Sequence, residues 1–381
     1  MNNTLHIVAF QNPTPANYGG VIDVFYRIQA LHQAGVHVIL HCFYYDNRDD
    51  ISALQHLCQK VYMYPRQVGI KNQFSLTPYI VKSRRHPQLL KNLCQDKHPI
   101  LFDGLHCCDL LHHPALKKRV KWVRMHNIEH DYYRQLAKNE SNWKNKLFFS
   151  IEAYRLKRFE PIVQHAQGIF AVSLADQHYL QQKYPHVPCY HMPCFHVEQD
   201  RTEGYSDQPY LLYHGNLSVA ENQNVVKYLL KNWQAKYPPL YIAGKNANAF
   251  ASLVCTPNVQ LFDQVEEQQL NQLIKHAKAN LMLTFQPTGF KLKLINSLLL
   301  GGFCIANEQM LSGTTLHNTC LVAQNWDELT KHIAAINNAN WSEKEEQIRQ
   351  EALAAYSNQA HVSIILSLIS KKKLRFFLGF K

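Results

Sequence analysis

The sequence has no apolar run of the roughly 18–20 residues that a membrane-spanning helix requires. Its first residues lack the basic start and the apolar core of a secretory signal peptide, and they are typical of a first β-strand instead. The 10 cysteines are scattered through apolar segments without the paired spacing of a zinc ribbon. Because a chain of 381 residues needs no disulfide bonds for stability, these absences favour a cytoplasmic protein with reduced cysteines.

The chain has fewer acidic than basic residues. The chain has 40 lysines and arginines against 28 aspartates and glutamates, which gives a formal net charge of +12. This excess favours an anionic partner, such as a phosphate ligand, a membrane surface or a nucleic acid. The basic residues are spread out and form no recognised nucleic-acid module, so nucleic acid is not the expected partner. A hydrophobic content of 46% excludes a disordered chain.

The length and the order of apolar segments predict two α/β domains. A chain of 381 residues fits two domains of roughly 150–200 residues each. A strand at 5–10, a glycine loop, a helix at 21–34 and a strand at 36–43 form a Rossmann-like opening. The opening lacks the G-x-G-x-x-G motif, so an ordinary dinucleotide site is not expected.

Apolar runs and helical patterns alternate along the rest of the chain, which indicates mainly parallel sheets. A polar segment at 198–209 is the expected linker, and the alternation restarts after it. We expect an N-terminal domain at 1–200, a second domain at 201–355, and a final helix with a basic tail at 356–381. Further expected strands are 61–64, 100–102, 121–125, 168–172, 210–214, 239–243, 259–262, 281–285 and 303–306, and further expected helices are 142–167, 221–236 and 266–277.

The stretch 288–307 carries the clearest chemical signal. Gly289 precedes an apolar helical pattern that has Lys291 and Lys293 in its first turn. The start of a helix exposes unpaired N–H groups and a partial positive charge, and both favour a bound phosphate. The sequence therefore predicts that a diphosphate binds here. The alternative is that the two lysines are merely solvated.

Five ordered segments resemble a known family of enzymes. They are Asn17-Tyr18-Gly19-Gly20, the stretch 124–130 (RMHNIEH), Glu160 with the stretch 166–176, the stretch 213–222 (YHGNLSVAEN) and the stretch 288–307. In this order they resemble the GT-B glycosyltransferases, and in particular those of the retaining family 4, over nearly the whole chain. The resemblance implies an α/β protein with two Rossmann-like parallel-sheet domains that face a cleft. It also implies a C-terminal helix that crosses back to the N-domain.

The resemblance assigns roles to residues in both domains. The N-domain would receive the acceptor, and the second domain would bind the nucleotide sugar. His126 and Lys293 are the expected catalytic residues. The residues expected to bind the donor are Gly19, Gly20, Gly215, Asn216, Thr288, Gly289, Phe290, Lys291 and Asn296. The resemblance implies no metal and no cofactor, the donor being a UDP- or GDP-sugar, and the sequence contains no Asp-x-Asp motif.

The expected reaction transfers a sugar to a hydroxyl group of a glycan or lipid-linked acceptor with retention of configuration. Departure of the leaving group places negative charge on the diphosphate, and amides and lysines already aimed at that charge lower the barrier. His126 would donate a hydrogen bond to a sugar hydroxyl or a phosphate. His130 is a weaker candidate for a functional role.

Two positions depart from the family pattern. The family has two glutamates eight positions apart, where this chain has Thr288 and Asn296. Asparagine still accepts a hydrogen bond, but it brings no charge. The departures leave open a non-catalytic protein that binds nucleotide sugars. A GT-B sugar-nucleotide epimerase is a further alternative, although it would need carboxylates in the cleft.

Two other segments invite a functional interpretation. Residues 106–109 (HCCD) with His112 and His113 contain metal-ligand types, but their crowding favours an ordinary strand end and loop. Residues 366–381 mix lysine and arginine with aromatic residues, which suits contact with an anionic membrane surface. A final helix that packs on the first domain is compatible with this contact.

Overall fold

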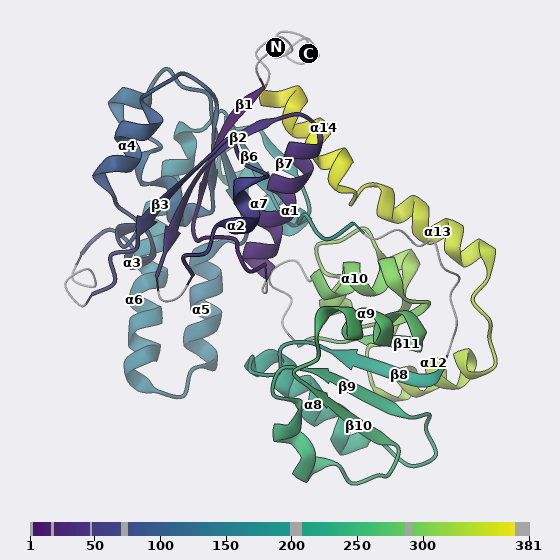
Figure 1. Cartoon of the computed structure of the whole chain (residues 1–381). Helices are drawn as coiled ribbons and strands as arrows, with labels where there is room; N and C mark the ends of the chain where they lie inside the picture. Colours follow the sequence, from purple (N-terminus) through teal and green to yellow (C-terminus); the bar gives the residue numbers. More distant parts are fainter. Residues whose placement is uncertain are drawn as a thin grey trace. The chain divides into compact units, whose positions relative to one another are not determined.

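The chain folds into two compact units, shown in Figure 1. Unit 1 comprises Met1–Val197 and Tyr356–Lys381, and unit 2 comprises Glu198–Ala355. The computed structural model describes residues 3–16, 19–45, 48–69, 75–198, 208–285 and 292–369.

Unit 1 is built on a parallel sheet that has seven strands within the described residues, in the order β3-β2-β1-β4-β5-β6-β7. The order reverses between β1 and β4, and such a reversal is where open α/β sheets bind their ligands. The strands are β1 (Thr4–Ala9), β2 (His37–Tyr44), β3 (Lys60–Pro65), β4 (Ile100–Asp103), β5 (Lys121–Met125), β6 (Gly168–Ala171) and β7 (Cys189–His191).

Helices cover both faces of this sheet. Successive strand side chains point to opposite faces, so Ile7 and Val8 of β1 enter two different hydrophobic clusters. The α-helices of unit 1 are α1 (Gly19–Gln33), α2 (Ser52–Gln55), α3 (Tyr79–Lys82), α4 (Pro87–Leu93), α5 (Glu129–Asn139), α6 (Trp143–Phe159), α7 (Leu174–Lys183) and α14 (Asn358–Ile369). Its 3₁₀ helices are η2 (Leu105–Leu110), η3 (Pro114–Leu116) and η4 (Glu160–His165).

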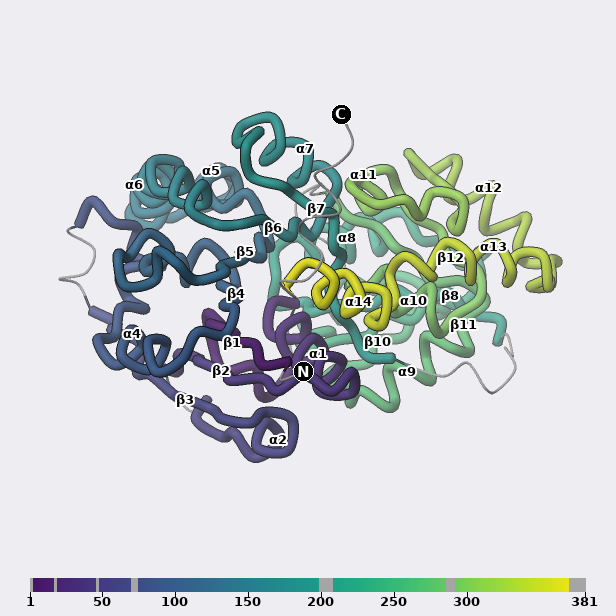
Figure 2. Tube along the Cα trace, turned by 90° about the horizontal axis from the view of Figure 1, so that it is seen from above, coloured from purple at the N-terminus to yellow at the C-terminus, as the bar shows by residue number. Residues whose placement is uncertain are grey.

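The C-terminal helix α14 belongs to unit 1, as predicted. Val362 and Ile365 of α14 are buried in the same cluster as Val24 and Ile28 of α1, and Figure 2 shows the two helices side by side. Asn358 Nδ2 donates to the carbonyl of His196 at 2.7 Å. Apolar burial and this hydrogen bond return the end of the chain to the first sheet.

One helical stretch among the described residues, Glu343–Ile369, is long and apolar enough to cross a membrane. It consists of two helices, because α13 (Glu343–Ala354) ends before α14 begins. The apolar side of α14 is buried against unit 1. Length and composition are therefore weak evidence for a membrane span here.

Unit 2 repeats the architecture of unit 1. Its sheet, also parallel, has the order β10-β9-β8-β11-β12-β13 within the described residues, with the reversal between β8 and β11. The strands are β8 (Gln208–His214), β9 (Leu240–Gly244), β10 (Val259–Asp263), β11 (Ala277–Met282), β12 (Phe303–Ala306) and β13 (Leu321–Val322). The helices are α8 (Ala220–Asn232), η5 (Ala247–Leu253), α9 (Glu267–His276), α10 (Leu292–Leu300), α11 (Glu308–Leu311), η6 (His317–Thr319), α12 (Trp326–Asn337) and α13.

The two parallel sheets confirm the predicted fold class, but some predicted boundaries are wrong. The helix predicted over 142–167 ends at Phe159 and continues as η4, because Pro161 has no N–H and its ring clashes with the preceding turn. The strand predicted at 281–285 is β11, which begins directly after α9. The first residues of β11 include the polar Lys278 and the buried Asn280, so they do not form the apolar run from which strands are predicted.

The loops after β8 and β9 meet at two glycines. Gly244 has φ +145°, a conformation that L side chains rarely adopt, and a Cβ atom there would lie 1.8 Å from the carbonyl oxygen of Gly215. Gly215 N in turn donates to the carbonyl of Ala243 at 3.0 Å. Only glycine permits this approach.

We therefore expect Gly244→Ala to destabilise the protein by at least about 3 kcal/mol, because strain and overlap act together. Gly35→Ala is the control, since Gly35 also has positive φ but no heavy atom within 4 Å of an added Cβ. Its cost should be about 1–2 kcal/mol, the cost of the left-handed conformation for an L residue. Urea unfolding, followed by circular dichroism, measures the free energy of unfolding of both variants. Equal values would contradict the close contact between Gly244 and the carbonyl oxygen of Gly215.

Candidate functional site

The predicted donor-binding residues of unit 2 gather at the carboxyl ends of its strands. Gly215 and Asn216 directly follow β8, and α10, which carries Lys293 and Asn296, follows β11. This is the reversal point of the sheet, where ligands of such folds bind. The remaining predicted residues, Thr288, Gly289, Phe290 and Lys291, lie outside the described residues.

Lys293 is held against the end of β8. Its Nζ lies 3.1 Å from Asn222 Oδ1 and 3.3 Å from the Tyr213 hydroxyl. It also lies 4.8 Å from the centre of the Tyr213 ring, a cation–π contact. Asn222 Nδ2 donates to the carbonyl of Asn216 at 3.0 Å. The ammonium is thereby fixed beside the loop that contains Gly215 and Asn216.

Two further polar contacts support this edge of the sheet. His214 Nε2 and the Ser297 hydroxyl lie 3.0 Å apart, and both residues are buried. Burial and the nearby Lys293 lower the pKa of His214 to about 3, so the ring is neutral. The Thr284 hydroxyl donates to the carboxylate of Glu221. A carboxylate, a hydroxyl and a fixed ammonium thus surround the ends of β8 and β11.

Asn296 is half-buried on α10, three residues after Lys293. Residues at this spacing share one side of a helix. Its amide therefore lies on the same side of α10 as the ammonium, where it can accept or donate a hydrogen bond.

In unit 1, His126 lies at the carboxyl ends of β4 and β5. Its Nε2 lies 2.9 Å from Asp103 Oδ1, and its Nδ1 lies 3.9 Å from Asp23 Oδ2. The side chain is only 12% exposed, whereas both aspartates are fully buried. Sequence reasoning selected His126 and missed its two acidic neighbours.

Two buried arginines balance the two aspartates. Arg124 forms a bidentate pair with Asp23, with both N–O distances 2.7 Å. Arg27 lies 2.9 Å from Asp23 and 2.8 Å from Asp103. Burial alone would raise the pKa of Asp23, but Arg124 and Arg27 hold it far below the usual range. Burial alone would also raise the pKa of Asp103, but Arg27 and His126 together lower it below the usual value.

Asp23, Asp103 and His126 bring their ligand atoms within 4.8 Å of one another, a spacing that could hold a metal ion. The charge balance argues against one. Each carboxylate already faces a guanidinium, and a divalent cation would add two positive charges to a buried site whose charges cancel. The donor set therefore fits an ionic network better than a metal centre.

Gly19 and Gly20 form the first turn of α1. A Cβ on Gly20 would lie 2.7 Å from Cζ of Phe10. The missing side chain lets the start of α1 approach the end of β1, at the reversal point of the unit 1 sheet. The other two residues of the predicted loop, Asn17 and Tyr18, lie outside the described residues.

The weaker sequence candidates have structural partners. His130 Nδ1 lies 2.9 Å from Glu160 Oε2, and both residues are buried. In the segment 106–109, Asp109 pairs with Arg85, and the Cys108 thiol contacts the carbonyl of Gly104. All 10 cysteines are free.

Glu129, the first residue of α5, is a buried acid at the same edge of the sheet as His126. Its Oε1 lies 3.9 Å from His106 Nδ1. Burial raises the pKa of Glu129 to about 8, although Arg84 opposes the shift. The carboxyl group is therefore mostly protonated at neutral pH. The position of Glu129 within the motif 124–130 did not indicate this.

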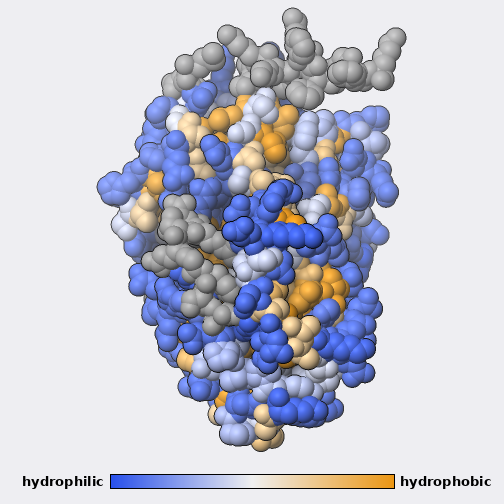
Figure 3. Space-filling view, turned by 90° about the vertical axis from the view of Figure 1, so that its right-hand side faces the viewer, coloured by the Kyte–Doolittle hydropathy of each residue, from blue (hydrophilic) through white to orange (hydrophobic). Residues whose placement is uncertain are grey.

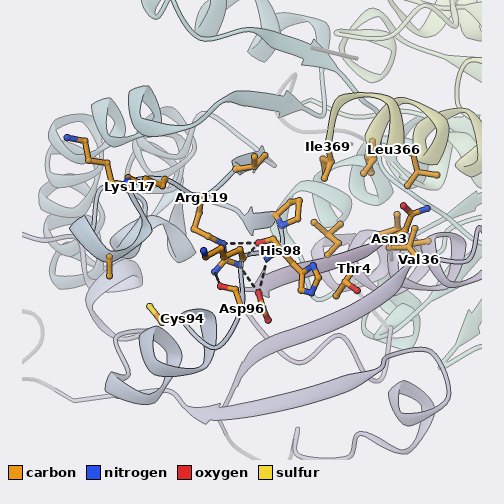
Figure 4. A pocket seen from close by; sticks show the side chains of 18 of the residues that line it. Asn3, Thr4, Val36, Cys94, Asp96, His98, Lys117, Arg119, Leu366 and Ile369 are labelled. Atoms are coloured by element: carbon orange, nitrogen blue, oxygen red, sulfur yellow. Dashed lines mark hydrogen bonds and ion pairs between the residues drawn. The ribbon is translucent and has the colours of Figure 1, made fainter. Parts of the chain in front are cut away.

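A cavity of about 970 Å³ lies at the opposite edge of the unit 1 sheet (Figure 4). Its walls include Thr4 at the start of β1, and Pro99 and Val120, which directly precede β4 and β5. Arg119 binds the carbonyl of His98 and the carboxylate of Asp96 in its wall. None of the predicted site residues that the structure describes lines this cavity.

Comparison with known proteins places the structure among GT-B folds. No family model matches the chain. An uncharacterized 44.6 kDa protein in the cps region of Klebsiella pneumoniae is 25% identical over 372 residues, covering 92% of this chain and 94% of that protein. Sucrose-phosphate synthase from Thermosynechococcus elongatus has a TM-score of 0.68 at 15% identity, covering 95% of this chain and 97% of its own.

Two further solved structures are TarM and the lipopolysaccharide outer core galactosyltransferase WaaB. TarM has a TM-score of 0.66 at 10% identity, covering 97% of this chain and 99% of its own. WaaB has a TM-score of 0.62 at 12% identity, with the same two coverages. These likenesses confirm the GT-B fold that the sequence predicted.

The raised pKa of Glu129 predicts a pH-dependent stability difference. Since the folded-state pKa of about 8 exceeds the usual value of 4.5, the folded form binds the proton more tightly, and stability falls as pH rises between these values. Glu129→Gln removes this loss. We expect its advantage in Tm over the wild type to grow by at least about 3 °C from about pH 5 to about pH 8. A constant difference in calorimetric scans would show that Glu129 ionises normally.

Proposed function

We propose that the protein is a glycosyltransferase that moves a sugar from a UDP- or GDP-sugar to a hydroxyl group of a glycan or lipid-linked acceptor, with retention. The observation that carries the proposal is the Lys293 ammonium, which lies 3.1 Å from Asn222 Oδ1 beside the loop of Gly215 and Asn216. The GT-B fold and the relative from the cps region are consistent with sugar transfer in polysaccharide synthesis.

The groups at the carboxyl ends of β8 and β11 in unit 2 are of the kind that bind a nucleoside diphosphate. A fixed ammonium stabilises the negative charge that develops on the diphosphate without reorganising during the reaction. The carboxylate of Glu221 and the amide of Asn296 lie near the same strand ends, and both accept hydrogen bonds from hydroxyl groups such as those of ribose. In the proposal these two side chains accept the hydrogen bonds that glutamates accept in the family pattern.

In unit 1, Asp103 would orient His126. The 2.9 Å contact with Asp103 engages Nε2 of His126. In the proposal Nδ1, which lies 3.9 Å from Asp23 Oδ2 and so beyond hydrogen-bond distance, contacts a substrate hydroxyl or phosphate. In the proposed reaction Asp103 is thus a positioning residue. Its own position depends on Arg27.

A non-catalytic protein that binds nucleotide sugars is the competing proposal, and Asn296 favours it because the position carries no charge. A thermal-shift panel of UDP, GDP, CDP and their sugars separates the two when combined with assays of transfer and donor hydrolysis. Ligand that binds only the folded state raises stability by about 2.7 kcal/mol at a hundredfold excess over Kd. Binding without turnover would support the competing proposal, and no shift with any ligand would contradict both.

We expect Lys293→Ala to lower turnover of the active donor at least about 100-fold, as loss of one transition-state donor does in other enzymes. It should also weaken binding of the nucleoside diphosphate. Lys227→Ala, at an exposed position on α8, is the matched control and should retain activity. Steady-state kinetics with circular dichroism as a folding check measures the effect. Wild-type activity in Lys293→Ala would remove the diphosphate assignment.

A further inference from the structure

Helix α6 exposes a row of large apolar side chains. Trp143, Leu147, Ile151 and Tyr154 are 68%, 53%, 41% and 62% exposed. Spacings of four, four and three residues place them on one side of the helix. We call these four residues the α6 stripe.

The α6 stripe is separate from the side of α6 that packs on unit 1. Ala153 and Leu156 are buried, and Leu156 joins the core of the sheet. The helix therefore has two apolar sides. One packs on the rest of unit 1, and the other, the α6 stripe, is exposed. Single exposed apolar residues are normal on a protein surface. The face in Figure 3 shows apolar patches within a larger hydrophilic area. A continuous helical row calls for a partner.

Cationic side chains border the α6 stripe. Lys144, Lys146, Lys157 and Arg158 are exposed on the same helix. The acidic residue of α6, Glu152, is buried and accepts from the backbone N–H of Ile80 at 3.1 Å. The exposed surface of α6 thus combines apolar and aromatic groups with positive charge.

The acidic groups of the adjoining hairpin turn and α5 are engaged locally. Glu140 accepts from the backbone N–H of Asn142 at 2.9 Å, just before α6 begins. Asp131 of α5 pairs with Arg134. Glu140 therefore leaves one negative charge beside the four exposed cations of α6, and the surface around the stripe stays positive overall.

We propose that the α6 stripe docks on an anionic membrane surface. Helices that lie in a membrane interface carry tryptophan and leucine on one side and lysine and arginine beside it, and each lysine adds electrostatic attraction to anionic lipid. A second copy of the chain is the less favourable occupant, because a symmetric contact would bring the same cations of both copies together.

The position of the helix fits a peripheral contact. α5 begins four residues after the carboxyl end of β5, so the α5–α6 hairpin leaves the sheet from the edge that holds Asp103 and His126. The two helices lie side by side in both views (Figures 1 and 2). The docking surface is independent of the proposed function, but it would bring this edge close to the lipid.

Sedimentation of the full chain with vesicles tests the surface. We expect binding to phosphatidylcholine vesicles that contain about one third phosphatidylglycerol, and much weaker binding to phosphatidylcholine alone. The variants Leu147→Glu and Lys144→Glu/Lys146→Glu should each lower the partition coefficient at least about tenfold. The controls Val68→Glu and Lys117→Glu/Lys118→Glu change exposed residues of unit 1 that lie outside α6 in the sequence and should leave binding within about twofold.

Three outcomes would overturn the proposal. The first is a wild type that does not bind the anionic vesicles. The second is wild-type binding by both α6 variants, which would assign the interaction to another part of the chain such as the basic residues 371–381. The third is a wild-type dimer in light scattering that Leu147→Glu converts to a monomer, which would make a second copy the occupant.

Discussion

The carboxylate of Asp23 is the constraint on which the arrangement of side chains at the carboxyl edge of the unit 1 sheet depends. It receives two hydrogen bonds from Arg124, one from Arg27 and one from the backbone N–H of Phe195. These groups come from α1, β5 and the chain that follows β7. Removing one partner from a buried ion pair costs about 3–5 kcal/mol, because the other charge stays uncompensated. His126 is therefore held by a network whose members cannot move separately.

The two units share one sheet topology, but the charged groups at the carboxyl ends of their strands are arranged differently. At the unit 1 edge, two aspartates and two arginines cancel within a buried network, so little net charge is left for a ligand. At the unit 2 edge, the Lys293 ammonium donates to the hydroxyl of Tyr213 and the amide oxygen of Asn222, and the carboxylate of Glu221 lies near the same strand ends. The two edges therefore differ in how their described charges are held, by a closed network of four buried charges in unit 1 and by hydrogen bonds to neutral oxygens at Lys293 in unit 2.

The sequence predicted the architecture better than the site. Parallel strands are continuous apolar runs, so the strands at 121–125 and 303–306 could be located to the residue. The network around Asp23 could not be located in this way, because the hydrogen-bond partners of Asp23 outside α1 lie 101 and 172 positions away along the chain, and no sequence pattern indicates such pairings. The available signal was an Asp23–Arg27 pair one turn apart inside an apolar helix. The motif predicts Lys293 as a site residue, but the contact between its ammonium and Asn222 is visible only in the structure.

The return of α14 to unit 1 has a consequence for biosynthesis. The chain emerges from the ribosome in order, so the sheet of unit 1 and α1 are made before the whole of unit 2. Until α14 follows, the side of α1 that bears Val24 and Ile28 has no cover from Val362 and Ile365. The first unit made is thus the last one completed, and a nascent chain must keep that apolar face from aggregation while 158 residues of unit 2, Glu198–Ala355, are synthesised.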